Sequence, residues 1–236
     1  MYTFKSRVRY SEIDATGTLS LNGVINYMQD CSTFQSEDLG VGIEYLKSKH
    51  RAWLLNSWQI VIHRYPKLCE EIEIGTQAYD FSSMFGHRNF ILRDSNNQVL
   101  AVANSLWILV DTITGHPVKI RKEDVDIYGS GQPLEMEYAG RKILLPKEME
   151  EQNSFIVESY HIDTNNHVNN GQYVQMAMTC IPQQVTITQI RAEYKRQALL
   201  HDTIVPYVGK IENEYVVSLN DTNKKPYAVV SFLVSK

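Results

Sequence analysis

The sequence predicts an α+β protein in which one unit, a helix lying across a curved antiparallel sheet, occurs twice in tandem. First, residues 13–19 align with residues 162–168, and the same offset pairs Cys31 with Cys180. Second, apolar residues at helical spacing follow both segments. Third, long runs of β-branched and aromatic residues follow each predicted helix. Self-similarity at a constant offset is the signature of a duplicated architecture.

Each predicted helix carries a single apolar stripe, because its apolar residues recur every three or four positions. Ser20 can cap the first helix and Asn169 or Asn170 the second, since a short polar side chain accepts from the first free backbone amides. Gly40 and Pro182 are plausible stops. The stripe residues are Leu21, Val24, Met28 and Cys31 in the first copy and Tyr173, Met176, Ala177 and Cys180 in the second.

Four strands are expected after each helix, where β-branched and aromatic residues are interrupted by turn-forming ones. Asx-rich turns at 94–97 and 220–223 divide the last two strands of each copy. A second alignment, of residues 64–72 with 196–204, supports the duplication. The expected strands are 53–65, 72–83, 85–94 and 99–110 in the first copy and 186–196, 202–211, 214–219 and 227–234 in the second.

The composition is that of a globular protein, and the repeat divides it into two domains. We expect an N-terminal domain at 1–128, a linker at 129–152 and a C-terminal domain at 153–236, since the intervening segment is rich in charged residues, Gly and Pro. A net charge of −4 argues against a nucleic-acid binder, which needs a basic excess. The 3 cysteines show no CxxC spacing and no apolar segment is long enough to span a bilayer, so a cytoplasmic location is expected.

The most informative segment is residues 160–170, which leads into the second helix. Asp163, Asn165 and His167 stand at alternate positions, so in an extended loop they can point to one side. They would offer a carboxylate, an amide and an imidazole to one small volume. Asx-rich loops before helices also serve as caps and turns, so the spacing alone leaves both interpretations open.

The internal repeat favours a chemical role for this loop. The first copy keeps the aspartate, as Asp14, but has Thr16 where Asn165 stands and Thr18 where His167 stands. If the loop needed those residue types only to fold, the first copy would need them too. The loop of the second copy is therefore expected to take part in a reaction, and the loop of the first copy only in folding.

The motif at 163–170, Asp-x-Asn-x-His-Val-Asn-Asn, resembles the active-site loop of the acyl-acyl carrier protein thioesterases of plants and bacteria, which are built as two tandem hot-dog domains. Residues 192–198 resemble the second active-site strand of that family, which in plant members commonly reads Glu-Tyr-Arg-Arg-Glu-Cys. The sequence departs from that pattern at Gln197, in place of the glutamate, and at Ala198, in place of the cysteine.

The resemblance implies hydrolysis of the thioester of fatty acyl-acyl carrier protein, releasing free fatty acid in fatty acid biosynthesis. Because position 198 offers no nucleophile, we expect direct attack by water. An imidazole suits proton transfer near neutrality, so His167 is the candidate acid or base. Asp163 would fix its neighbours or share the base role, and Asn165 would hold the carbonyl or the water. Gln197 is expected as a neutral hydrogen-bonding partner.

The resemblance also implies that the first domain binds the acyl chain, and an acidic carrier protein calls for a basic docking patch. Aromatic residues and Met are more often plain core, so a lining role is one of two interpretations. The candidate lining residues are Trp53, Trp58, Met84, Phe85 and Met28. The candidate basic clusters are 47–51, 119–122, 141–142, and Arg191 with Lys195 and Arg196.

No metal or other cofactor is expected, because the remaining histidines lack the spacing of a zinc site. Two alternatives stay open for the function. One is hydrolysis of acyl-coenzyme A, which presents the same thioester; the other is a non-catalytic acyl-binding module on the same fold. The sequence also leaves open whether the protein is a monomer or a homodimer.

Overall fold

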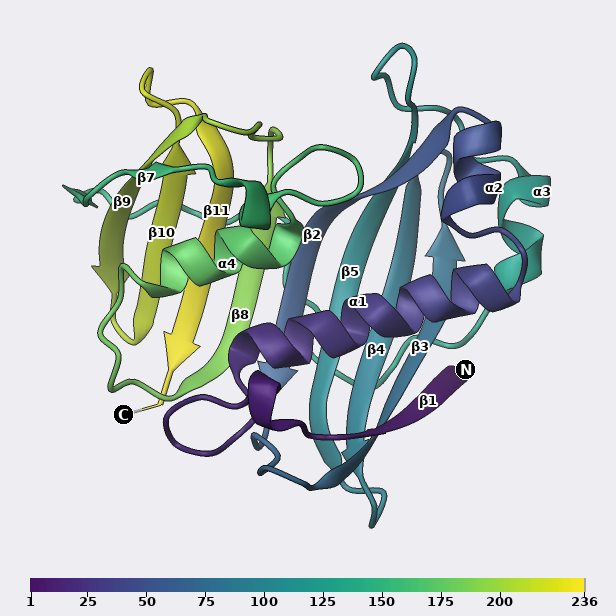
Figure 1. The fold of residues 1–236 in the computed structure, drawn as a ribbon, viewed down its shortest axis with the longest axis horizontal. Helices are drawn as coiled ribbons and strands as arrows, with labels where there is room; N and C mark the ends of the chain where they lie inside the picture. The colour runs from purple at the N-terminus through teal and green to yellow at the C-terminus, as the bar shows by residue number, and fades with distance from the viewer. Residues whose placement is uncertain (236) are drawn as a thin grey trace. The chain divides into compact units, whose positions relative to one another are not determined.

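The computed structural model describes residues 1–235 and divides into two compact units (Figure 1). Unit 1 comprises Met1–Asn56 and Ile60–Tyr138, and unit 2 comprises Ser57–Gln59 and Ala139–Lys236. Each unit has one long helix in front of an antiparallel sheet, as the sequence predicts. Within residues 1–235, no helix combines the length and the apolar character needed to cross a membrane.

In unit 1 the strand order is β1-β3-β4-β5-β2, and the longest helix, α1, crosses the face of this sheet (Figure 1). Four short elements were not predicted: the helices α2 and α3 and the 3₁₀ turns at Tyr10–Glu12 and Asp126–Tyr128. The elements are β1 (Tyr2–Arg7), α1 (Leu21–Asp38), α2 (Ile43–Ser48), β2 (Arg51–Ile62), β3 (Glu71–Phe81), β4 (Phe85–Asp94), β5 (Val99–Asp111) and α3 (Lys122–Val125).

In unit 2 the order β7-β9-β10-β11-β8 repeats that of unit 1 strand for strand, with β6 as an additional partner of β9. Its helix α4 packs on β10 and β11. The shared order confirms the duplication inferred from the sequence. The elements are β6 (Glu150–Glu151), β7 (Phe155–Ile156), α4 (Asn170–Met178), β8 (Ile187–Tyr194), β9 (Thr203–Ile211), β10 (Glu214–Asn220) and β11 (Pro226–Val234).

Both helices begin at the predicted caps. The Ser20 hydroxyl accepts from the Gly23 amide at 3.1 Å, and the Asn169 side chain accepts from the Gly171 amide at 2.8 Å. Such a bond satisfies one of the free amides of the first turn and is worth about 1 kcal/mol. α1 stops just before Gly40, whose φ of +71° lies in the left-handed region that favours glycine.

The core of unit 1 lies between α1 and one face of its sheet. On β3 the alternate residues Ile72, Ile74 and Ala78 are buried, and the Cys31 thiol of α1 lies 3.6 Å from the Ile74 carbonyl. This alternation is what a strand with one covered face requires. In unit 2, α4 buries Tyr173, and the adjacent sheet buries Phe232 completely.

β2 and β8 end earlier than the sequence predicts, at Ile62 and Tyr194. The amides of residues 63 and 64 both donate to the Leu100 carbonyl, at 2.8 and 3.2 Å. In unit 2 the amides of residues 195 and 196 both donate to the Tyr227 carbonyl, at 2.8 and 3.1 Å. Two successive amides on one carbonyl break the ladder pattern, so each strand ends there and a loop follows.

The segment expected as a linker is largely bound to the sheets. In unit 1 the Leu134 amide and the Tyr138 hydroxyl donate to the buried Asn89 side chain, at 2.9 and 3.1 Å. In unit 2, Arg191 donates to two carbonyls of residues 140–142, at 2.6 and 2.9 Å, and Ile143 is buried. Although this segment is rich in charged residues, parts of it are therefore held against the two sheets.

Candidate active site

Residues 162–168 of unit 2 form a tight turn that leads into α4. The Asp163 amide donates to the His167 carbonyl at 2.8 Å, and the Asn166 amide donates to the Asp163 carbonyl at 3.1 Å. Asn166 has a φ of +61°, a conformation that asparagine tolerates better than most residues. Gly17 stands at the equivalent position of unit 1 with a φ of +78°, so the two copies share one backbone path.

The Asp163 carboxylate is engaged within this turn. One of its oxygens accepts from the Asn165 amide at 2.7 Å and, in a longer contact of 3.4 Å, from the His167 amide. In unit 1 an Asp14 oxygen accepts from the Thr16 amide at 2.8 Å. The aspartate therefore closes the same Asx turn in both copies.

The two copies differ at the next two alternate positions. In unit 1 the hydroxyls of Thr16 and Thr18 lie 2.9 Å apart, and Thr16 also donates to Asp14 at 2.6 Å. Side chains at these positions of the turn are therefore neighbours. In unit 2 the corresponding residues are Asn165, which is exposed, and His167, which is half-buried.

His167 has an unpaired ring nitrogen. Among residues 1–235, no group hydrogen-bonds its Nδ1, although this atom is buried. Leaving a buried polar atom unpaired costs about 1–3 kcal/mol, and a folded protein keeps few such groups. This nitrogen therefore keeps its hydrogen-bonding capacity unused within the described residues.

The loop after β8 lies directly against the turn. The Val168 amide donates to the Ala198 carbonyl at 3.0 Å, as the Leu19 amide of unit 1 does to the Pro66 carbonyl at 2.7 Å. Ala198 is buried and Gln197, next to it, is exposed. The structure therefore brings the predicted residues of the 163–167 turn and the segment carrying Gln197 to one corner of unit 2.

α4 begins where the turn ends, at Asn170. The first backbone amides of a helix lack intrahelical partners, and its N-terminus carries partial positive charge. This end of α4 is therefore favourable for a developing negative charge.

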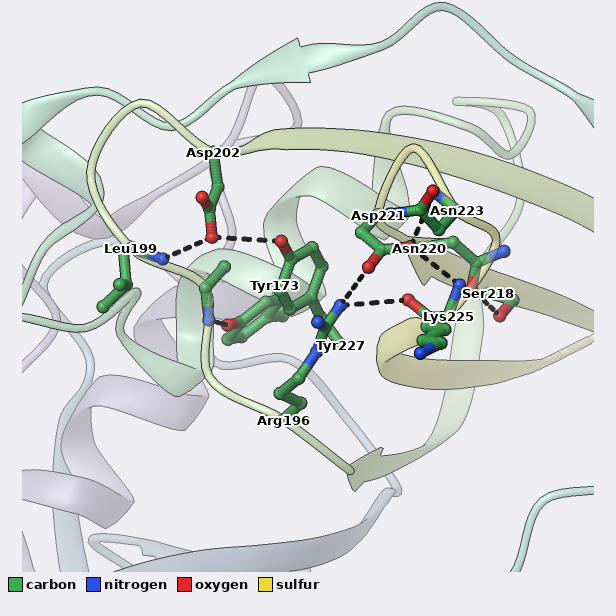
Figure 2. Close-up of polar contacts among 11 residues, drawn as sticks. Tyr173, Arg196, Leu199, Asp202, Ser218, Asn220, Asp221, Asn223, Lys225 and Tyr227 are labelled. Atoms are coloured by element: carbon green, nitrogen blue, oxygen red, sulfur yellow. Dashed lines mark hydrogen bonds and ion pairs between the residues drawn. The ribbon is translucent and has the colours of Figure 1, made fainter. Parts of the chain in front are cut away.

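A polar network supports the loop after β8 (Figure 2). The Tyr227 hydroxyl and the Leu199 amide both donate to the Asp202 carboxylate, at 3.0 and 2.9 Å. Arg196 pairs with Asp221 at 2.7 Å and stacks on the Tyr227 ring at 4.3 Å. Burial and the hydrogen bond to Asp202 raise the pKa of Tyr227 to about 12, so its hydroxyl stays protonated and donates.

A second histidine near the turn, His161, accepts from the Glu158 amide at 2.9 Å through Nδ1, and its ring centroid lies 4.2 Å from that of Tyr160, with the two rings tilted by 55°. Burial lowers the pKa of His161, which suits this acceptor role. Within residues 1–235, no three side chains of His, Cys, Asp or Glu are grouped as a metal site would need.

The candidate acyl-lining residues have different surroundings. Trp53 packs near Phe81, with 6.5 Å between ring centroids, while Met84 is 43% exposed. Phe85 is next to Gly86, whose Cβ direction faces Phe81 and Trp53, so alternation along β4 points Phe85 to the other side. Trp58 is buried within the segment of β2 that belongs to unit 2.

Sequence reasoning missed two tyrosines that touch the loop after β8. Tyr173 was predicted only as part of an apolar stripe, and Tyr227 only as the start of a strand. The signal that could have found them is in the repeat, where Val24 and Leu100 occupy the equivalent positions.

Two family profiles match the chain, "Acyl-ACP thioesterase N-terminal domain" over residues 1–128 and "Acyl-ACP thioesterase C-terminal domain" over residues 145–229. Among curated proteins, it is 24% identical over 210 residues to the chloroplastic acyl-[acyl-carrier-protein] hydrolase FATB2 of Cuphea viscosissima. That match covers 80% of this chain and 50% of the Cuphea protein. The chain thus spans about half the length of this curated relative.

Solved structures match over nearly the whole chain. An oleoyl thioesterase (putative) from Lactobacillus plantarum has a TM-score of 0.87 at 23% identity, covering 100% of this chain and 96% of that one. An acyl-ACP thioesterase from Bacteroides thetaiotaomicron has a TM-score of 0.89 at 20% identity, covering 99% and 97%. These likenesses confirm the predicted fold class, α+β with two tandem hot-dog domains.

Proposed function

The chain belongs to the acyl-ACP thioesterase family, and we propose that it hydrolyses the thioester of a fatty acyl-acyl carrier protein and releases the free fatty acid. One observation carries the proposal. On a turn with the same backbone path and the same aspartate contact in both copies, unit 2 alone has Asn165 and His167, and the imidazole Nδ1 is buried with no partner among residues 1–235. In this proposal unit 1 binds the acyl chain and unit 2 carries the reaction.

The reaction begins with a water molecule held beside His167 and Asn165. The water oxygen attacks the thioester carbon as the imidazole takes its proton, and the carbonyl becomes an oxyanion. The oxyanion then collapses, the carbon–sulfur bond breaks, and the imidazolium returns the proton to the departing thiolate. A positioned acid or base of this kind is typically worth about 10²- to 10⁴-fold in rate.

The other residues prepare this step. Asp163 holds the turn through the Asn165 amide, which supports the fixing role over a share of the base role. The side-chain amide of Asn165 supplies a donor toward the oxyanion, and the N-terminus of α4 adds partial positive charge. A preorganised donor of this kind contributes about 2.7–4 kcal/mol. Ala198 offers no nucleophile and Gln197 no base, so attack by water is the route that these residues allow.

The proposal is tested by offering the purified protein matched acyl-carrier and acyl-coenzyme A thioesters of several chain lengths and recording release of free thiol. We expect release from the carrier thioester. No release from either would contradict the proposal, and release from the coenzyme A thioester alone would replace it with the alternative substrate.

Docking of an acidic carrier protein would depend on the basic clusters of the chain. Several of their members are paired with acids, such as Lys47 with Glu44 at 3.0 Å and Lys195 with Glu193 at 2.9 Å, which weakens them as docking sites. We expect KM for the acyl-carrier substrate to rise with ionic strength, because salt screens exposed charges. The uncharged acyl-pantetheine thioester is the control, and an equal salt effect on both substrates would contradict docking by charge.

Gln197 distinguishes this chain from the plant pattern. An amide orients water but cannot accept its proton, so the Gln197→Glu variant should hydrolyse the acyl-carrier thioester at least as fast as the wild type. Gln197→Ala, which removes the side-chain amide, should be slower. Steady-state kinetics measure both, and loss of activity in Gln197→Glu would contradict the water-orienting role.

We propose a cytoplasmic location, because the odd number of cysteines and the lack of CxxC spacing favour a reducing compartment.

A further inference from the structure

Three tyrosines of unit 2 stand where unit 1 has aliphatic residues. They occupy the helix, the end of the strand before the loop, and the start of the last strand. The copies align at these positions because the helix stripes, the strand ends and the hairpin turns all correspond. The pairs are Tyr173 and Val24, Tyr194 and Ile62, and Tyr227 and Leu100.

Two of the three hydroxyls bond to the loop after β8, and the third bonds to the first residue of α4. Tyr173 accepts from the Ala198 amide at 2.8 Å, and Tyr194 donates to the carbonyl of Asn170 at 3.0 Å. Tyr227 donates to Asp202 at 3.0 Å, in the network of Figure 2. Burial raises the pKa of Tyr173 and of Tyr194, so these phenols also stay neutral and can donate.

Unit 1 cannot form an equivalent of the bond from Ala198 to Tyr173. There the equivalent of Ala198 is Pro66, which has no backbone N–H and needs no acceptor. The equivalent of Tyr173 is accordingly Val24. Unit 2 therefore has both an additional donor and the hydroxyl that satisfies it.

Unit 1 also shows that the fold does not depend on these hydroxyls. It forms the same turn closed by Asp14 and the same backbone contact, from Leu19 to Pro66, with Val24 and Leu100 in place of tyrosines. The Tyr173 hydroxyl satisfies a donor that unit 1 lacks, but a requirement of the shared backbone path for the other two hydroxyls would apply to both copies. The hydroxyls are present only in the copy that carries Asn165 and His167.

We infer that Tyr173, Tyr194 and Tyr227 are positioning residues that hold the turn bearing Asn165 and His167 and the loop bearing Gln197 in one fixed relation. Tyr194 acts on the start of α4 just after the turn, whereas Tyr173 and Tyr227 act on the loop after β8. This inference rests on the proposed function, since the relation between these two loops matters only if both act on one substrate.

The test replaces each tyrosine with phenylalanine and measures steady-state hydrolysis of the acyl-carrier thioester. We expect kcat to fall about tenfold or more in each variant with KM unchanged, because a displacement of about 1 Å at a reacting centre can cost 10²-fold. Tyr207→Phe is the matched control. It also removes one hydroxyl bond of unit 2, to Glu151 at 2.7 Å, but one that touches neither loop, so kcat should stay at the wild-type value.

A double-mutant cycle isolates the Tyr173 bond. Ala198→Pro removes the donor, as in unit 1, so adding Tyr173→Phe to it should change kcat less than twofold. Wild-type kcat in all three single variants, or a fall that only follows loss of folded protein by circular dichroism, would overturn the inference. An inactive wild type would instead overturn the proposed function.

Discussion

His167→Ala should lower kcat by about 10²- to 10⁴-fold, the range that a positioned acid or base supplies. Its Nδ1 is buried without a partner among residues 1–235, so removing the ring breaks no hydrogen bond of this atom within the described chain. The half-buried ring leaves little apolar packing to lose, and the melting temperature should change by only a few degrees. Steady-state kinetics and a thermal melt measure the two effects separately.

Thr18→Ala is the matched control for this variant, since Thr18 holds the equivalent position in unit 1. It removes the contact with the Thr16 hydroxyl at 2.9 Å and should leave kcat within about twofold of the wild type, because surface changes of this kind cost about 0.5 kcal/mol. Wild-type turnover in His167→Ala would exclude the imidazole as the proton carrier.

Asp163→Ala should reduce both stability and activity, whereas Asp14→Ala should reduce stability alone. Each change removes a carboxylate that accepts from an amide two residues on, at 2.7 Å in unit 2 and 2.8 Å in unit 1. Hydrogen bonds to a charged group contribute about 1.5–3 kcal/mol, so the two losses in unfolding free energy should be similar. Only the first change also frees Asn165 and His167 to move, and it should lower kcat by about 100-fold.

Denaturant unfolding and steady-state kinetics on this pair test the assignment. If Asp163 also serves as a base, Asp163→Asn will be as inactive as Asp163→Ala, although the amide oxygen can still accept from the Asn165 amide. If the aspartate only closes the turn, Asp163→Asn should recover most of the activity.

Much of the fold could be predicted because local patterns decide it. The strand expected at 85–94 is β4, and the helix caps at Ser20 and Asn169 are those observed. The ends of β2 and β8 could not be predicted, since they depend on carbonyls of Leu100 and Tyr227 that are distant in sequence. A run of β-branched and aromatic residues does not show where hydrogen bonding to the neighbouring strand ends.

The candidate site, like the fold, could be predicted only in part. The alternation of Asp163, Asn165 and His167, set against the first copy, located the turn without any structure. It could not show that the aspartate is occupied with backbone amides, because this depends on the path of the turn. The role of the Tyr173 hydroxyl could not be predicted either, since a buried tyrosine and an apolar residue give the same helical pattern. Only the structure shows that this hydroxyl accepts from the Ala198 amide.

The short strands β6 and β7 have a consequence for self-association. One edge of β9 pairs with β10, and β6 and β7 lie one after the other along its second edge, which would otherwise be open. An open edge of this kind is a template for pairing with another chain, and so for aggregation. Residues 150–156 therefore cover this edge of β9, and we expect that shortening the segment would expose the edge and promote aggregation.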